Sequence, residues 1–243
     1  NYMKQDGLSE SKRYFEEYIS SVIMWLPIYG RGEVVQQLTT PGVYYRNGEL
    51  IFVNVEVKEP DKDELKNALA ILEELKTWYS KSVEKLATIL RWGAVAPLGY
   101  AYKQSRGFNG EFIPWLLLAG NSRTGKSTLG RVVLYLYGLA EYKEDQKEQY
   151  IEVGSAANTE YRLGEVLRKS TFPRLVNEPG RLFEEKGNID LVKGAVEGPT
   201  ARAIGVRGKK RRIPSLSSLI ITTNNEPPED DALINRFIII RFS

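Results

Sequence analysis

The sequence predicts an α/β fold in which a five-stranded parallel sheet is preceded by a mainly helical region with a small β-hairpin. From residue 112 onward, short apolar runs alternate with stretches of helical periodicity, which is typical of a parallel sheet covered on both faces. A glycine-rich loop joins the first apolar run to a helix. Before residue 108, apolar residues mostly recur at helical spacing. We therefore expect a helical region over residues 1–107 and an α/β domain over residues 108–243.

The helical region is expected to contain one hairpin, because Asn47-Gly48 separates two strand-like runs. This residue pair favours a tight type I′ turn, in which both positions need positive φ. Apolar stripes at helical spacing, which we expect to be buried core, predict the helices. They are 9–25, a helix that follows a capping-box pattern at 61–64, and 82–104 with a break near Pro97.

The α/β domain is expected to place its ligand beyond the carboxyl ends of its strands, as parallel sheets of this kind do. Residues 143–149 form a charged connector. The strands expected are 115–119, 150–153, 174–177, 216–223 and 237–242, and the helices between them are 127–137, 159–168 and 189–196.

The loop after the first strand fits the phosphate-binding pattern G-x-x-x-x-G-K-[ST]. Such a loop surrounds phosphate oxygens with backbone N–H groups; Lys126 neutralises the β and γ phosphates and Ser127 offers its hydroxyl to Mg²⁺. The alternative is a glycine-rich turn before an ordinary helix. We expect a site for a nucleoside triphosphate, ATP, made of Gly120, Asn121, Ser122, Arg123, Thr124, Gly125, Lys126, Ser127 and Thr128.

Composition narrows the possible chemistry. The chain has 243 residues, no cysteine and no histidine, so disulfides, thiolate or imidazole metal sites and histidine-based triads are excluded. Oxygen ligands for Mg²⁺ remain. The net charge is only +3, so a nucleic-acid signal has to be local. The apolar run 20–30 is too short to span a bilayer. We expect a cytoplasmic protein without a membrane partner, and a chain that is a piece of a longer one because it stops within a strand-like run.

An acidic residue follows the third predicted strand. Glu178 stands where a parallel sheet brings its strand ends to the phosphate loop, so it is our candidate for the general base that orients and deprotonates the attacking water. The alternative is a surface glutamate before the turn Pro179-Gly180. Asn177, directly before it, is a neutral candidate ligand for the metal, alongside Ser127 and Glu178.

Polar residues also follow the fourth strand and precede the fifth. Asn224 could reach the γ-phosphate or the water, with Asn225 as the second choice; alternatively, both only form a turn before the prolines. Arg236 could stabilise transition-state charge if a neighbouring subunit supplied it. Its alternative role is a surface salt bridge.

A basic segment lies between the third and fourth strands. Residues 200–213 carry six positive side chains and no acidic one, with glycines suited to a hairpin tip. Because this segment has no aromatic side chain for stacking, we expect salt-sensitive contact with a nucleic-acid backbone, and single-stranded DNA is the expected partner. A solvated turn is the alternative. The candidate residues are Arg202, Arg207, Lys209, Lys210, Arg211 and Arg212.

The order of these features resembles the P-loop AAA+ ATPase core of superfamily 3 helicases over residues 112–243. The likeness is closest to primase-associated helicases of viruses and plasmids, through segments 191–198 and 221–227, while 235–237 resembles the MCM replicative helicases. The resemblance implies a ring of six subunits with ATP between neighbours and hairpins in a central channel.

Within such a ring, the resemblance gives each candidate residue a place. Lys126, Ser127, Glu178 and Asn224 act from one subunit and Arg236 from the next, and Arg207, Lys209 and Lys210 grip the strand. Most related ATPases have an acidic residue that helps to hold the metal at the position of Asn177, so this sequence departs from the pattern.

The function expected first is an ATP-driven hexameric helicase or translocase for DNA replication of a plasmid or virus. An ATP-dependent initiator or packaging motor would share the same core. A nucleotide-switched DNA-binding initiator or scaffold with little hydrolysis is the alternative outside enzymes, and Asn177 favours it. A small-molecule kinase would leave the basic segment without a role.

Overall fold

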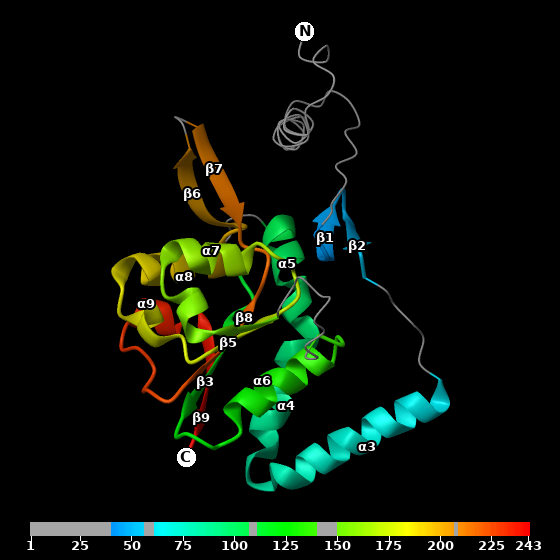
Figure 1. Ribbon diagram of the computed structural model, residues 1–243. Helices are drawn as coiled ribbons and strands as arrows, with labels where there is room; N and C mark the ends of the chain where they lie inside the picture. The colour runs from blue at the N-terminus through cyan, green and yellow to red at the C-terminus, as the bar shows by residue number, and fades with distance from the viewer. Residues whose placement is uncertain (1–39, 56–60, 107–110, 140–149, 207–208) are drawn as a thin grey trace, which may run out of the picture. The chain divides into compact units, whose positions relative to one another are not determined.

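The computed structural model describes residues 40–55, 61–106, 111–139, 150–206 and 209–243 (Figure 1). The expected helix over 9–25, the connector 143–149 and the hairpin-tip residue Arg207 lie outside these ranges.

The central sheet has five parallel strands, as the sequence predicts. They are β3 (Trp115–Gly120), β4 (Ile151–Val153), β5 (Arg174–Asn177), β8 (Leu219–Thr223) and β9 (Phe237–Phe242), and they lie in the order β4-β5-β8-β3-β9. One boundary was wrong: β8 begins three residues later than expected. The backbone N–H groups of Leu216 and Ser217 donate to the Leu167 carbonyl instead of to a strand.

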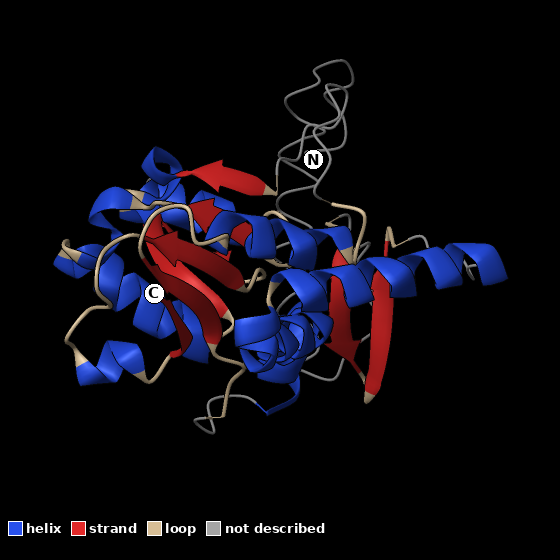
Figure 2. Ribbon diagram, turned by 90° about the horizontal axis from the view of Figure 1, so that it is seen from below, coloured by secondary structure: helices blue, strands red, loops and turns tan. Residues whose placement is uncertain are grey.

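Helices cover both faces of this sheet, and the alternating side chains of β3 show which helices pack where (Figure 2). Leu116 and Leu118 face a cluster that contains residues of α4 (Val83–Val95) and α6 (Lys126–Tyr135). Trp115 and Leu117 face a cluster with residues of α7 (Glu160–Leu167) and α8 (Lys186–Glu197). This two-sided burial explains the continuous apolar run of β3. The helices of the α/β domain are α6 (Lys126–Tyr135), α7 (Glu160–Leu167), α8 (Lys186–Glu197) and α9 (Asp231–Ile234), with short 3₁₀ turns η4 (Gly154–Ala157) and η5 (Gly180–Phe183).

The expected early hairpin is present as β1 (Gly42–Arg46) and β2 (Glu49–Val53). Asn47 and Gly48 have φ values of 52° and 90°, as the tight turn requires. The hairpin packs on α5 (Gly99–Arg106) through an edge-to-face contact of the Tyr44 and Tyr100 rings.

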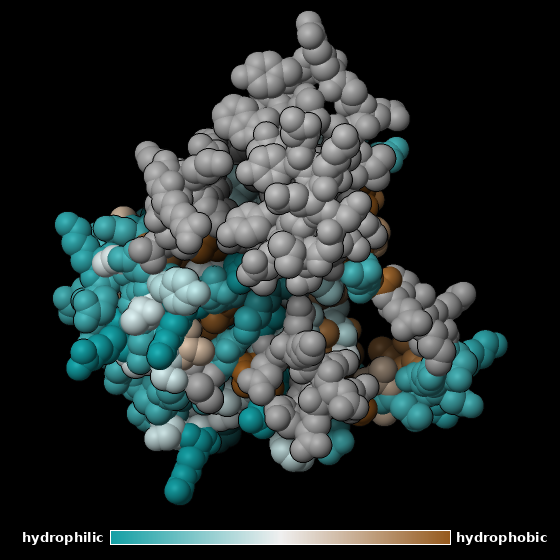
Figure 3. Space-filling view, turned by 45° about the horizontal axis from the view of Figure 1, so that its top comes forward, coloured by the Kyte–Doolittle hydropathy of each residue, from teal (hydrophilic) through white to brown (hydrophobic). Residues whose placement is uncertain are grey.

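Helix α3 (Lys62–Trp78) begins at the expected capping box: Asp61 accepts from the Glu64 N–H at 2.8 Å, and the Glu64 carboxylate accepts from the Asp61 N–H at 3.1 Å. The expectation that its apolar stripe is core was wrong. No residue of α3 is buried, and Leu65 and Leu69 are 50% and 54% exposed. Leu75 near the helix end is the residue of α3 that packs on a core cluster, because residues 62–71 of the helix are all exposed. Apolar side chains accordingly reach the surface around α3, at the right of Figure 3.

The next helical stretch is buried. Helix α4 (Val83–Val95) is followed without a loop by η3 (Ala96–Leu98) and α5, so the helix breaks at Pro97 as predicted. Side chains of α4 share a hydrophobic cluster with α6 and the sheet. The boundary expected at residue 107 stays a prediction, although α4 and α5 precede it and pack on the α/β domain.

The basic segment forms an antiparallel hairpin of β6 (Thr200–Val206) and β7 (Lys209–Pro214), with Val206 opposite Lys209 (orange in Figure 1). Only four residues, 215–218, separate β7 from the beginning of β8. The hairpin therefore lies next to the amino end of β8, whereas the loop after β3 lies at the carboxyl edge of the same sheet. No helix in the described parts of the chain is long and apolar enough to cross a membrane.

Candidate functional site

The phosphate-loop pattern folds as a tight turn between β3 and α6. Gly120 and Gly125 have φ values of 135° and 86°, and Arg123 has a φ of 64°, so three positions use the left-handed region. At Gly120 a side chain is excluded outright, because an added Cβ would lie 1.8 Å from the Phe242 carbonyl oxygen. The turn brings the loop to the first residue of α6, Lys126.

The Lys126 amine is held inside this turn. Its Nζ donates to the carbonyl oxygens of Gly120 at 2.8 Å and Asn121 at 2.6 Å, and to Asn224 Oδ1 at 3.0 Å. A longer contact of 3.4 Å joins it to Thr124 Oγ1, and the residue is only 4% exposed. These acceptors are neutral oxygens, so the positive charge of the lysine remains available to an anion.

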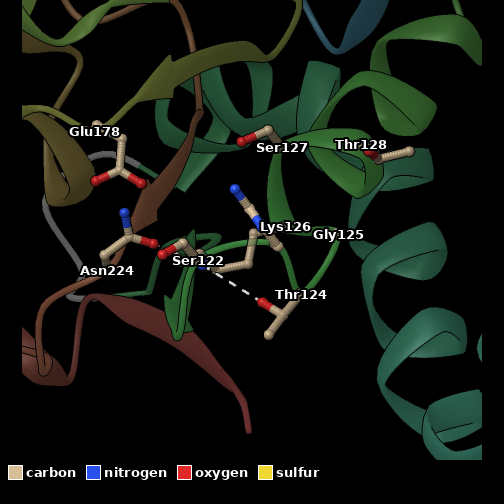
Figure 4. Close-up of a pocket in the computed structure, with 9 residues that line it drawn as sticks. Ser122, Thr124, Gly125, Lys126, Ser127, Thr128, Glu178 and Asn224 are labelled. Carbon is tan, nitrogen blue, oxygen red and sulfur yellow. Dashed lines mark hydrogen bonds between the residues drawn. The ribbon is translucent and has the colours of Figure 1, made fainter.

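A cavity of about 210 Å³ opens beside this amine (Figure 4). The loop forms one side, and residues from the ends of β5 and β8 form the other. Segments far apart in the sequence therefore meet at the carboxyl edge of the sheet, where the sequence placed the site. The cavity is lined by Ser122, Arg123, Thr124, Gly125, Lys126, Ser127, Thr128, Glu178 and Asn224.

A short chain of oxygen atoms lies next to the loop. Ser127 Oγ donates to Asn177 Oδ1 at 2.6 Å, and Thr222 Oγ1 donates to the same oxygen at 2.7 Å. Thr222 is directly opposite Asn177 in the pairing of β5 with β8. These contacts fix the Asn177 amide with its oxygen toward Ser127. Hydroxyl and amide oxygens are ligands that Mg²⁺ accepts, so this donor set fits that ion when phosphates supply the negative charge.

Glu178 lies on the cavity wall, with an exposed side chain. Its backbone φ of 54° is left-handed, which costs a residue other than glycine about 1–3 kcal/mol. The backbone is fixed there by a 3.1 Å bond from its N–H to the Thr222 carbonyl and by Gly154, where a Cβ would lie 1.8 Å from the Glu178 carbonyl oxygen. The Glu178 carboxylate, directly after the end of β5, therefore lies at the cavity that the phosphate-loop residues line.

The two asparagines after β8 differ in position. Asn224 lines the cavity and accepts from Lys126, as its place after the strand predicts. Asn225 does not line the cavity, and its backbone N–H donates to Thr223 Oγ1 at 3.0 Å. The structure therefore distinguishes two neighbours that the sequence left open.

Arg236 does not reach the cavity of its own chain. Its guanidinium pairs with Glu197 at the end of α8 and donates to the Ala232 carbonyl, and the side chain is 16% exposed. Both the surface salt bridge and the supply of this residue to a neighbouring site were open from the sequence. The first contact is present within the chain, and the second stays a prediction.

Two contacts at the site had no signal in the sequence. Thr222 bonds Asn177, which only the register of two distant strands could reveal. Tyr79, which follows α3, donates its hydroxyl to the Gly125 carbonyl at 3.3 Å, and burial raises the pKa of this tyrosine. A Cβ at Gly125 would lie 2.4 Å from the Tyr79 hydroxyl, so the end of α3 closes over the loop backbone.

The basic hairpin is far from this cavity along β8, at the opposite edge of the sheet. Its backbone carries the expected basic positions in two paired strands, with Ala203 opposite Arg212 and Gly205 opposite Lys210. The positions in these strands are Arg202, Lys209, Lys210, Arg211 and Arg212.

No family model and no curated protein matches this chain. Among solved structures, the Cch helicase of SCCmec type IV, described as an active helicase, is similar with a TM-score of 0.55 and 17% identity, over 93% of this chain and 44% of that one. The apo A form of the NrS-1 C-terminal region gives a TM-score of 0.41 and 14% identity, covering 92% and 52%. The chain spans less than half the length of Cch, and the likeness shows a shared α/β fold.

Proposed function

We propose that this chain is the motor core of an ATP-driven helicase or translocase that acts on nucleic acid. The observation that carries the proposal is the arrangement of β8. Its carboxyl end presents Asn224 to a cavity that also holds Lys126 and Glu178, and its amino end adjoins the root of the basic hairpin. One strand thus joins a candidate nucleotide site to a candidate nucleic-acid site. The fold shared with a helicase supports the same proposal.

In the proposed mechanism, the loop backbone and Lys126 bind the triphosphate. The Lys126 amine exchanges some of its neutral acceptors for β and γ phosphate oxygens, which are stronger acceptors because they are charged. Bound Mg²⁺ would neutralise charge on these phosphates, and Ser127 and Asn177 are the residues that would hold it, with Glu178 near by.

Glu178 then orients and deprotonates the attacking water, and Asn224 holds the water or the γ-phosphate in line. The left-handed backbone of Glu178 keeps its carboxylate at the cavity before any substrate arrives. Because Asn224 also accepts from Lys126, a phosphate that draws this amine away releases the asparagine amide at the end of β8.

The site is expected to be completed by a neighbouring subunit. Arg236 pairs with Glu197 on the α8 and α9 side of its own chain, away from the cavity, so any role in catalysis would be at the site of the next subunit in a ring. We propose a homo-hexamer, with the hairpins of its subunits directed to a common channel for single-stranded DNA. A role in the replication of a plasmid or virus rests on the resemblance to primase-associated helicases.

Steady-state ATP hydrolysis tests the proposal. Because the sites are shared, turnover per subunit should rise with protein concentration and rise further with single-stranded DNA. A mixture of Arg236→Ala chains with Glu178→Gln chains should recover part of the activity, since intact sites form between unlike neighbours. Turnover per subunit that stays constant as the protein concentration rises, and no recovery in a mixture whose co-assembly is confirmed, would contradict a shared site.

A second candidate function is a nucleotide-switched DNA-binding initiator or scaffold. Asn177 favours it, because the residue bonded to Ser127 is neutral and attracts a metal ion less than a carboxylate does. Turnover that Glu178→Gln abolishes would exclude this reading. Nucleotide-dependent DNA binding without turnover would support it against the motor.

A further inference from the structure

A second buried lysine lies at the root of the basic hairpin. Lys103 on α5 is 4% exposed, and its Nζ donates to the Ala195 carbonyl at 2.9 Å, the Ser215 carbonyl at 3.0 Å and the Ser215 hydroxyl at 3.2 Å. None of these hydrogen bonds involves a residue that lines the nucleotide cavity. Its role is therefore not explained by the proposed chemistry.

The residues that accept from Lys103 are those that flank the hairpin. Ala195 lies in the last turn of α8, which runs into β6, and Ser215 directly follows the end of β7. The two flanks are also joined to each other, since Ser215 Oγ donates to the Ala195 carbonyl at 2.7 Å and the Ser215 N–H donates to the Pro199 carbonyl at 2.9 Å. Lys103 thus bonds both roots of the hairpin to one helix.

Helix α5, which carries Lys103, is connected to the nucleotide loop through α4 and α6. Gly93 on α4 packs against α6, where an added Cβ would lie 2.9 Å from a Val133 methyl, and the Tyr137 hydroxyl donates to the Gly93 carbonyl at 2.6 Å. Helix α6 begins at Lys126 of the loop. The path from the loop to the hairpin root therefore runs through α6, α4 and α5 and does not include β8.

The middle of this path also contacts Ser218, the residue directly before β8. The Ser218 hydroxyl donates to the Ala96 carbonyl at 3.3 Å, and a Cβ on Gly99 would lie 2.7 Å from that hydroxyl. Close contact without room for a side chain therefore packs η3 and α5 tightly against the residue that precedes β8.

Burial of the charged Lys103 amine costs folding free energy. In the described parts of the chain no carboxylate pairs with it, and desolvation lowers its pKa to about 7. An apolar residue of similar length would avoid this desolvation but could not donate to both flanks of the hairpin. The geometry therefore gives a reason for a lysine here that stability alone does not.

We propose that Lys103 is the positioning residue that fixes the root of the β6–β7 hairpin to α5, and that through α4 and α6 it couples the hairpin to the nucleotide cavity. The coupling rests on the proposed function, in which the hairpin binds DNA and the cavity binds ATP. The fixing of the hairpin root is independent of the proposed function, because it depends only on the three hydrogen bonds that Lys103 donates.

Two measurements on the full chain test these parts separately. In Lys103→Met, which keeps the length and removes the donors, backbone amides of residues 215–217 should exchange with deuterium faster, on the order of tenfold. The stimulation of kcat by single-stranded DNA should fall by a factor on the order of ten. Basal kcat and the KM for ATP should not change, because no cavity residue is altered. Arg91→Met, at an exposed position of α4, is the matched control and should change neither.

The outcomes separate the two claims. Unchanged exchange at 215–217 would overturn the positioning role, and faster exchange with full DNA stimulation would overturn the coupling. If the wild-type chain shows no DNA stimulation, the proposed function fails, whereas faster exchange would still support the fixing of the root. If Lys103→Met does not fold, Ser215→Ala removes one acceptor and should give a smaller acceleration, and no acceleration would overturn the positioning role.

Discussion

Two lysines lie near opposite ends of β8, and they resemble each other closely. Lys126 and Lys103 are both 4% exposed, and both donate to neutral oxygens of the backbone and of side chains. Their surroundings differ. Lys126 lines a cavity, so an anion can reach it, whereas Lys103 is enclosed by α5, α8 and the hairpin root. A lysine is therefore suited to binding a ligand at the carboxyl end of β8, and to fixing the backbone near the amino end.

Removing the lysine at the cavity should act on ligand binding itself. Lys126→Ala should weaken ATP binding in calorimetry about 100-fold, because charge-assisted bonds to phosphate are lost at a cost of about 2–3 kcal/mol. Arg131→Ala, at an exposed position of the same helix α6, is the control and should bind normally. An unchanged ATP affinity of the Lys126 variant would contradict the assignment of residues 120–128 as a phosphate-binding loop.

The next effect should separate chemistry from binding at the same edge. Glu178→Gln should reduce kcat by about 10²–10⁴, the range for loss of a general base, while ATP still binds. Glu229→Gln, outside the cavity lining, is a control of the same type and should retain activity. Similar losses in both variants would remove Glu178 from its proposed role.

The enclosed lysine should appear in the pH dependence of stability. The native chain releases the Lys103 proton near pH 7, whereas the unfolded chain holds it to about the ordinary value of 10.5. The unfolded state therefore binds more protons between these values, so the free energy of unfolding contributed by Lys103 rises with pH from about 7 upward and is lowest below pH 7. The difference in Tm between the wild type and Lys103→Met should shift in favour of the wild type from pH 6 to pH 9. A difference that stays constant would mean that Lys103 titrates normally.

The smallest effect is expected at Asn177. Asn177→Asp introduces a charge beside Ser127 without changing size, so the Mg²⁺ concentration needed for half-maximal ATP hydrolysis should fall several-fold. Titration of Mg²⁺ at fixed ATP measures it. A rise in that concentration would indicate that Asn177 serves Ser127 and Thr222 rather than the metal.

The sheet was predictable because its signals are local. Four of its strands lie within one residue of their expected bounds, since buried parallel strands read as apolar runs between turns. The start of β8 was missed because residues 216 and 217 bond the end of α7, a contact that only the folded chain creates. Helix α3 was predicted as a helix but not as an exposed one, because an apolar stripe does not identify what covers it.

The candidate site was predictable to the same extent. Lys126, Glu178 and Asn224 follow strand ends, and the topology alone brings strand ends together. The contact of Tyr79 with Gly125 joins residues 46 positions apart, and that of Lys103 with Ser215 joins residues 112 positions apart. No local sequence pattern predicts such contacts. The pairing of Arg236 with Glu197 depends in the same way on the packing of α8 near α9.

ATP hydrolysis measured with and without single-stranded DNA tests most directly whether the two ends of β8 work together. We expect hydrolysis that DNA stimulates, and a loss of this stimulation, but not of basal hydrolysis, when the basic pair Lys209 and Lys210 is replaced by alanine. Turnover that is the same with and without DNA, in a chain that binds both ATP and DNA, would show that the two ends of β8 do not work together.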